Sequence, residues 1–325
     1  MKIPENIRRY FAIDTYGWVA TAAILICAVS GALLAVPYDV TSPYLSVTKL
    51  VTANPAASLL RNIHYWSAQL FLILTLIHIF DHLWKGTESN IRKKSVWFRL
   101  TLSLIFTMYV MLSGFILKAD GDSLQAQRIL SSLVGSLPWI GSMLQQTFIG
   151  SENNFQVLYI QHAATATVIL FVIIMEHARS LKVNVRTLLV TAFIITLFSF
   201  LFRAPVNGLN DAVMKGPWYF IGLQETLHWV SNPLFISIAL IMLLILVYLI
   251  PWVKPMYSKM IKLFFLAMII VYSLLTISGF FFRGPMWQWQ WPWEENYKIQ
   301  PLLHSEKITF SSADTTRLPV IQGHA

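Results

Sequence analysis

Seven apolar stretches, each about 20 residues long, constrain this chain more than any other feature of its sequence. A helix of about 20 residues crosses the hydrocarbon core of a bilayer. Only 12% of the residues are charged, against about 25% in soluble proteins, and the charges cluster between the apolar stretches. The sequence therefore predicts an all-α polytopic membrane protein and excludes a soluble enzyme. The seven predicted transmembrane helices cover residues 17–37, 60–83, 97–117, 157–178, 186–203, 233–252 and 261–282.

The charges between the predicted helices indicate their orientation. With the N-terminus in the cytoplasm, the whole formal charge of +9 lies on the cytoplasmic side and the opposite side is neutral. Because cytoplasmic loops carry the excess of Lys and Arg, we expect a multi-pass protein of a bacterial-type inner membrane, with its C-terminus on the outer side. Nucleic-acid binding is not expected, because the sequence has no basic patch interleaved with aromatic residues.

Four histidines form two matched pairs within the predicted helices. His64 and His78 are 14 residues apart, and His162 and His177 are 15 residues apart. At about 100° and 1.5 Å per residue, the members of each pair lie near one helix face and about 21–22 Å apart along the axis. Two such helices facing each other would bring the imidazoles together as two cross-helix pairs. This arrangement suits bis-histidine ligation of two haem irons, which leaves no open position for oxygen and favours electron transfer.

Small residues and the cysteine content refine this prediction. A macrocycle between helices requires small neighbours, and Gly17 and Gly31 repeat the 14-residue spacing in the first helix, while Gly114 lies at the end of the third. Taken alone, these glycines are equally compatible with ordinary helix contacts. The chain has one cysteine, Cys27, and no Cys-x-x-Cys-His sequence. We therefore expect two non-covalent haem b groups and no covalent haem.

Several motifs together resemble cytochrome b of the Rieske/cytochrome b quinol-oxidising complexes, over about residues 10–282. These motifs are Arg61-Asn-Ile-His64 with Ala68 and His78, Gly114-Phe-Ile-Leu117, Pro138-Trp-Ile-Gly141, His162, His177, and Pro217-Trp-Tyr-Phe-Ile-Gly-Leu-Gln-Glu225. The histidine set is highly specific, and the Pro-Trp-Tyr segment is moderately so. The chain looks closest to the branch in which the haem subunit and the quinol-site subunit are separate proteins, although here the two are fused.

The resemblance implies a di-haem four-helix domain at 1–180, a three-helix quinol-site domain at 181–283 and a Trp-rich tail outside the membrane at 284–325. It implies a subunit of a quinol:cytochrome c-type oxidoreductase that oxidises a quinol, such as menaquinol, at the outer face. Electrons would pass through two haems to a quinone site near the cytoplasmic face, coupled to proton translocation. The implied partners are a Rieske iron–sulfur protein, a c-type cytochrome, membrane lipid and a second copy of the chain.

The resemblance also implies roles for single residues. His64 and His162 would hold the outer haem, and His78 and His177 the inner one. Arg61 would pair with a haem propionate, because a guanidinium at the membrane edge otherwise lacks an obvious anion. The residues expected at the quinol site are Pro138, Gly141, Pro217, Trp218, Tyr219 and Glu225.

The departures from the family pattern are informative. The family's Pro-Glu-Trp-Tyr reads Gly216-Pro-Trp-Tyr219 here, so the carboxylate that takes a quinol proton is missing from its usual place. Glu225 is the best substitute base, with Tyr219 as its partner, because shielding by nearby aromatic residues would raise the pKa of Glu225. The alternative for Glu225 is a solvated loop acid. Lys118 replaces a family Pro, and Thr15 stands where the split branch has a haem-attaching Cys.

Two other classes of protein stay open at this point. One is a b-haem membrane anchor of a dehydrogenase or reductase, which has no quinone cycle and usually lacks the Pro-Trp-Tyr loop. The other is a transporter or structural helix bundle without a cofactor. The segment 204–232 discriminates the first, and an absorbance spectrum discriminates the second.

Overall fold

The computed structural model describes residues 13–294 except 87, 89, 90, 92, 153, 178–183, 210 and 212, and in this part of the chain every regular element is a helix. Apolar helices occupy all seven predicted stretches. They are α2 (Ile13–Ala35), α4 (Pro55–Lys85), α5 (Lys94–Ile116), the continuous run of α8 (Gln156–Ile160), η2 (Gln161–Thr165) and α9 (Ala166–His177), α10 (Val185–Leu201), α12 (Pro233–Leu249) and α13 (Pro255–Phe281). Five are long and apolar enough to cross a membrane, whereas α10 and α12 have 17 residues each. The all-α membrane fold is confirmed, and the count of seven spans stays a prediction.

Polar residues at the helix ends explain where two of these helices begin. The side chain of Asn54 accepts hydrogen bonds from the backbone amides of the first turn of α4, and Asn232 does the same for α12. In both cases a proline follows at the first helical position, where its missing N–H costs nothing. Asn-Pro therefore starts both helices at defined residues.

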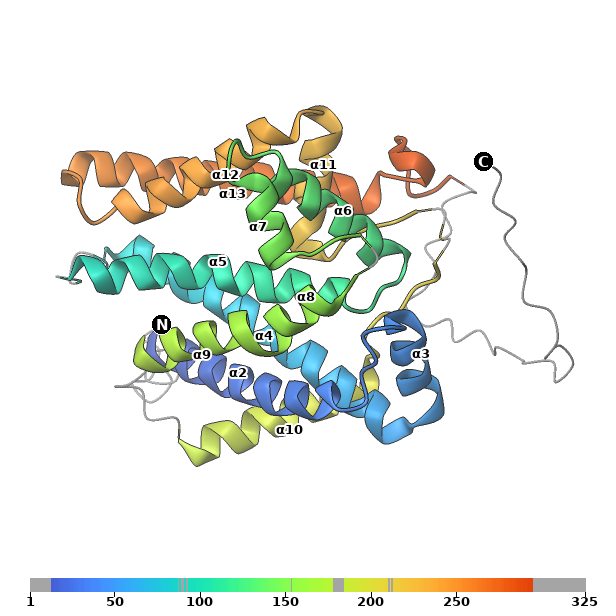
Figure 1. Cartoon of the computed structure of the whole chain (residues 1–325). Helices are drawn as coiled ribbons and strands as arrows, with labels where there is room; N and C mark the ends of the chain where they lie inside the picture. The colour runs from blue at the N-terminus through green and yellow to red at the C-terminus, as the bar shows by residue number, and fades with distance from the viewer. Residues whose placement is uncertain are drawn as a thin grey trace, which may run out of the picture.

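The helices pack as a bundle with a second group beside it (Figure 1). In the bundle, α2 packs along α4 and α5 packs along α9, while α10 packs against both α2 and α4. In the second group α11 (Trp218–Trp229) packs against α13, and α12 contacts α5 and α6 (Gly121–Gly135). The first four apolar helices thus form the predicted four-helix arrangement. The division into domains at 180 and 283 stays a prediction.

Shorter helices connect the long ones near one end of the bundle. Figure 1 shows α3 (Pro43–Ala53) at this end, with α6 and α7 (Gly141–Phe148) beside α5. The turn between α6 and α7 requires glycine, because a Cβ atom on Gly141 would lie 2.6 Å from the carbonyl oxygen of Gly135. A buried apolar cluster joins several of these helices. It includes Ile116 of α5, Leu158 of α8 and Tyr219 of α11.

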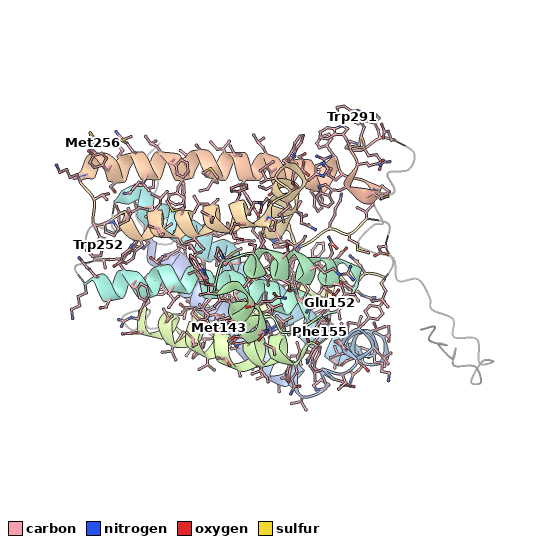
Figure 2. All side chains as sticks on the ribbon, turned by 45° about the horizontal axis from the view of Figure 1, so that its top comes forward. Met143, Glu152, Phe155, Trp252, Met256 and Trp291 are labelled. Carbon is pink, nitrogen blue, oxygen red and sulfur yellow. The ribbon has the colours of Figure 1, made fainter. Side chains whose placement is uncertain are left out.

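The outer surface of the bundle is apolar and its two ends carry aromatic residues. None of the most apolar stretch of α13 is buried, as expected for a helix that faces lipid. Figure 2 places Trp252 and Met256 at one end of the molecule and Trp291 at the other. Tryptophans at both ends are typical of a protein with two membrane interfaces.

Candidate functional site

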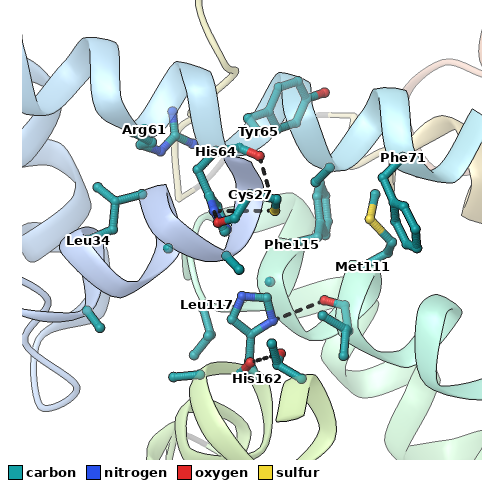
Figure 3. Close-up of a pocket in the computed structure, with 18 of the residues that line it drawn as sticks. Cys27, Leu34, Arg61, His64, Tyr65, Phe71, Met111, Phe115, Leu117 and His162 are labelled. Atoms are coloured by element: carbon teal, nitrogen blue, oxygen red, sulfur yellow. Dashed lines mark hydrogen bonds between the residues drawn. The ribbon is translucent and has the colours of Figure 1, made fainter. Parts of the chain in front are cut away.

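The two predicted histidine pairs face each other across the bundle. The ring centroids of His64 and His162 are 6.2 Å apart, and those of His78 and His177 are also 6.2 Å apart. Figure 3 shows His64 on α4 and His162 on the opposite side, with their rings directed toward the space between the helices. The structure therefore brings the four histidines together as two cross-helix pairs, as the spacing predicts.

A local distortion explains why one pair is 15 residues apart instead of 14. His162 lies in η2, a single π-helical turn inserted between α8 and α9. A π-turn closes i→i+5 hydrogen bonds and so contains one residue more than an α-helical turn. The hydroxyl of Thr167 donates to the His162 carbonyl within this distortion. The π-turn accommodates the additional residue, so that His162 and His177 both face their partners on α4.

Hydrogen bonds set the ring nitrogens of the first pair. His64 Nδ1 lies 2.9 Å from the carbonyl oxygen of Cys27, and His162 Nδ1 lies 3.1 Å from the carbonyl oxygen of Val110. A ring whose Nδ1–H donates to a carbonyl carries its lone pair on Nε2, which is the form that ligates a metal. Both rings are therefore held in the tautomer that haem iron requires.

The same two-residue sequence supports each ring of this pair. Ser30-Gly31 of α2 contacts His64, and Ser113-Gly114 of α5 contacts His162: the hydroxyls lie 3.4 and 3.2 Å from Nδ1. A Cβ atom on Gly31 would approach His64 Cε1 to 2.8 Å, and one on Gly114 would approach His162 Cε1 to 2.6 Å. Glycine is thus required for close approach at both positions. The repeated Ser-Gly is visible in the sequence, although only the glycines were predicted from it.

The second pair has less support. Among the described residues, His78 Nδ1 is buried without a hydrogen-bond partner. The ring of His82 is also close to His78, and the two ring centroids are 4.4 Å apart. The carbonyl of Gly17 accepts a hydrogen bond from the Thr21 hydroxyl, and the predicted contact of Gly17 with a haem stays a prediction.

A cavity of about 460 Å³ lies beside the first pair (Figure 3). Its volume falls within the range of about 300–1,000 Å³ that is usual for small-molecule and cofactor sites. His64, His162, Gly31, Gly114, Arg61, Lys118, Pro217 and Tyr219 are among its lining residues. Residues of the haem motifs and of the Pro-Trp-Tyr segment therefore share one cavity.

Of the six residues expected at the quinol site, Pro217 and Tyr219 line this cavity and the other four do not. The Trp218 indole donates to Gln69 Oε1, a lining residue, at 2.9 Å. The Tyr219 hydroxyl donates to the Met111 carbonyl at 2.9 Å, and burial raises the pKa of Tyr219 above its usual value. Pro138 and Gly141 belong to the turn between α6 and α7 and are not among the lining residues.

Arg61 has hydrogen-bond partners within the chain that its sequence neighbourhood does not indicate. Its guanidinium donates to the carbonyl oxygens of Ala204 and Pro205 at 2.9 and 3.0 Å. These residues belong to the loop after α10, which lies 143 residues or more along the chain, so the sequence did not reveal them. Arg61 still lines the cavity, and its pairing with a propionate stays a prediction.

The prediction that the pKa of Glu225 is raised is wrong. Burial tends to raise the pKa of this carboxyl, but hydrogen bonds from Arg283, Trp229 and Trp287 lower it overall. Arg283 Nη2 and Nε lie 2.6 and 2.9 Å from the two carboxylate oxygens, and the Trp287 indole donates at 2.8 Å. Glu225 is 1% exposed and is not among the residues that line the cavity. It is neither a solvated loop acid nor a neutral carboxyl, but a buried anion.

The first histidine pair fits a b-type haem. Two Nε2 lone pairs face one space, the rings are oriented by carbonyls, and two glycines keep the surrounding helices close. No group of three or more His, Cys, Asp or Glu that could hold a metal ion occurs among the described residues. A bis-histidine haem needs only two such ligands, because the porphyrin supplies the other four.

The chain is similar to known proteins along most of its length. Residues 1–185 match the family model for cytochrome b/b6/petB. Cytochrome b6 from two strains of Prochlorococcus marinus, NATL1A and NATL2A, is 24% identical over 153 residues, which are 46% of this chain and 68% of the relative.

The fold is similar to a solved chain of a hyperthermophilic respiratory Complex III. The TM-score is 0.57 at 18% identity, covering 82% of this chain and 83% of the other. The family model covers more than half of the sequence, and the histidine pairs have the geometry that its cofactor requires. The chain therefore belongs to the cytochrome b/b6 family of membrane-embedded, haem-binding electron-transfer proteins.

Proposed function

We propose that this protein is the di-haem cytochrome b subunit of a quinol:cytochrome c-type oxidoreductase. It oxidises a quinol, such as menaquinol, at the outer face, sends electrons to a quinone site near the cytoplasmic face and couples this to proton translocation. Its proposed partners are a Rieske iron–sulfur protein, a c-type cytochrome and a second copy of the chain. The proposed orientation has the N-terminus in the cytoplasm and the C-terminus outside, in a bacterial-type inner membrane.

The cavity supports this proposal more than any other observation. His64 and His162, the proposed ligands of the outer haem, line it together with Pro217 and Tyr219 of the proposed quinol segment. A quinol bound next to Pro217 and Tyr219 would thus lie beside a haem held by His64 and His162. A b-haem membrane anchor of a dehydrogenase or reductase usually lacks the Pro-Trp-Tyr segment, two residues of which line this cavity.

Side chains of this protein would hold the haems, orient the histidine ligands and exclude water. His64 and His162 would hold one haem, and His78 and His177 the other; when bound, the haems supply one-electron carriers between the two faces. Carbonyls and serines orient the first imidazole pair. Apolar residues of the cavity wall, such as Phe115 and Met111, exclude water from the place where quinol would bind.

The haem content tests this proposal. A pyridine haemochrome assay of the purified chain is expected to give about two haems, all extractable by acid acetone, because two bis-histidine sites and no covalent attachment are proposed. Menadiol should reduce the outer haem. One haem per chain, covalently retained haem, or a haem that quinol does not reduce would contradict the proposal.

The sequence predicts Glu225 as the proton acceptor, whereas its contacts with Arg283 and Trp287 favour a structural role. Its ion pair with Arg283 attaches the segment after α13 to α11. Removing one member of a buried ion pair typically costs about 3–5 kcal/mol, because the other charge is left unpaired. We expect Glu225→Gln to lower the thermal unfolding temperature and to leave the rate of quinol oxidation within about twofold of wild type. A tenfold slower rate at unchanged stability would instead establish Glu225 as the acceptor.

A further inference from the structure

Two buried aspartates and a lysine form a charged cluster next to the cavity. Lys118 Nζ lies 2.7 Å from Asp120 Oδ2, and these residues are 6% and 0% exposed. Asp122, which is 5% exposed, accepts hydrogen bonds from the Asn207 side chain and, at 3.0 Å, from the Lys215 amide. In the sequence Lys118 stands out only as a departure from the family pattern, and its contact with Asp120 is not visible there.

Lys118 connects this cluster to the cavity. It lines the cavity with Tyr219 and Pro217, and its ammonium lies 4.2 Å from the ring centroid of Phe115, another lining residue. An ammonium in a mostly apolar wall is costly, and ionisable groups in such positions usually serve a function. Packing alone does not require a cation here.

The two aspartates are held differently. Asp120 accepts hydrogen bonds from the backbone amides of Ser123 and Asn207 and pairs with Lys118. Burial is the largest influence on Asp122 and, with the charge of Asp120, outweighs Lys118 and the hydrogen bonds, so that the pKa of Asp122 rises to about 6. Asp120 therefore holds Lys118 in place, and Asp122 suits a group that gains and loses a proton.

We propose that Lys118 and Asp122 carry a proton away from quinol, with Asp120 holding Lys118 at the cavity wall. This rests on the proposed quinol oxidation. The Lys118 ammonium first gives one of its protons to the Asp122 carboxylate, and the resulting amine takes the proton of one quinol O–H bond as that bond breaks. Lys118 is again an ammonium, and Asp122 becomes a carboxylic acid. The second quinol proton is released at the outer face, and the two electrons leave by the routes of the proposed function, one to the external acceptor and one to the outer haem.

The charged groups that face Asp122 come from two segments. Lys118 and Asp120 belong to the connection between α5 and α6, and Lys215 belongs to the loop before α11. Burial lowers the pKa of Lys215 to about 8, although Asp122 opposes this shift. Lys215, in the loop before α11, is thus a second basic residue beside Asp122.

The variant Asp122→Asn tests this assignment, with menadiol as the donor and reduction of the outer haem as the readout. We expect the rate to fall at least about tenfold while the apparent KM and both haem spectra stay unchanged. Asp122→Glu should restore most of the rate. Asp211→Asn is the matched control, because Asp211 lies on the neighbouring loop and accepts from the Gly208 amide.

The wild-type pH profile provides a test without any variant. Below pH about 6 Asp122 is protonated and cannot accept, so the rate should rise as pH increases through about 6, and this step should be missing in Asp122→Asn. Asp122→Asn at the wild-type rate, or a wild-type profile flat between about pH 5 and 7, would overturn the assignment. If menadiol does not reduce the wild-type protein at all, the proposed function fails instead.

Discussion

The two histidine pairs have the same ring separation but differ in how they are supported. Each ring of the first pair, His64 and His162, is oriented by a backbone carbonyl and a serine and lies against a glycine. In the second pair, His78 has a buried Nδ1 without a partner among the described residues, and His177 is exposed. Helix spacing thus brings the imidazoles together, while contacts with neighbouring helices determine their tautomer and the space around them.

The largest effects are expected from removing one ligand of each pair. His162→Ala should lower the haem content from about two to one and abolish reduction by quinol, because the outer haem is the proposed acceptor. His177→Ala should also lose one haem but leave the outer haem reducible by quinol. Pyridine haemochrome assays and quinol-reduced difference spectra measure both effects. Loss of both haem spectra in either variant would mean that the two sites do not act separately.

A smaller effect is expected from filling the space at the outer pair. Gly114→Ala places a methyl group 2.6 Å from a His162 ring carbon, and such overpacking typically costs about 1–3 kcal/mol. Outer-haem affinity should therefore fall about 5-fold to 150-fold, while the inner haem is unaffected. Haem titration of the apoprotein measures this. Val29→Ala is the control, because this side chain is 65% exposed on α2, and equal affinities in the two variants would contradict the role of Gly114.

The smallest effect is expected from the serine beside His162. Ser113→Ala removes a hydroxyl 3.2 Å from Nδ1 but leaves the Val110 carbonyl in place, so the tautomer is kept. We expect outer-haem affinity to fall by no more than about tenfold, at the lower end of what such supporting contacts contribute. A redox titration that shows a shifted midpoint for the inner haem and none for the outer one would reverse the comparison.

Local patterns in the sequence were sufficient for much of the fold. The apolar stretches predicted every long helix, because burial in lipid depends on side chains within one segment. The spacing of His64, His78, His162 and His177 predicted both pairs, because helix periodicity is local. The π-turn at His162 was not predicted, although the 15-residue spacing is consistent with it.

The partners of the charged residues required the structure. Glu225 pairs with Arg283, 58 residues along the chain, and that ion pair reversed the expected direction of the Glu225 pKa. Asp122 receives its hydrogen bonds from Asn207 and Lys215, 85 and 93 residues away. The sequence neighbours of Glu225 indicated that aromatic residues shield its carboxyl. Its ion pair with Arg283, which is distant in the sequence, was not visible there.

Hydrophobicity and helical spacing are properties of single segments, so the sequence was sufficient to predict a helical membrane protein with two histidine pairs, and the resemblance of its motifs indicated cytochrome b. The tertiary structure was needed to establish how Glu225 is paired, which residues line the cavity and how the His64 and His162 rings are oriented. These features depend on contacts between segments far apart in the chain. The electrostatic effect of a contact changes steeply with distance and burial, which no residue pattern specifies.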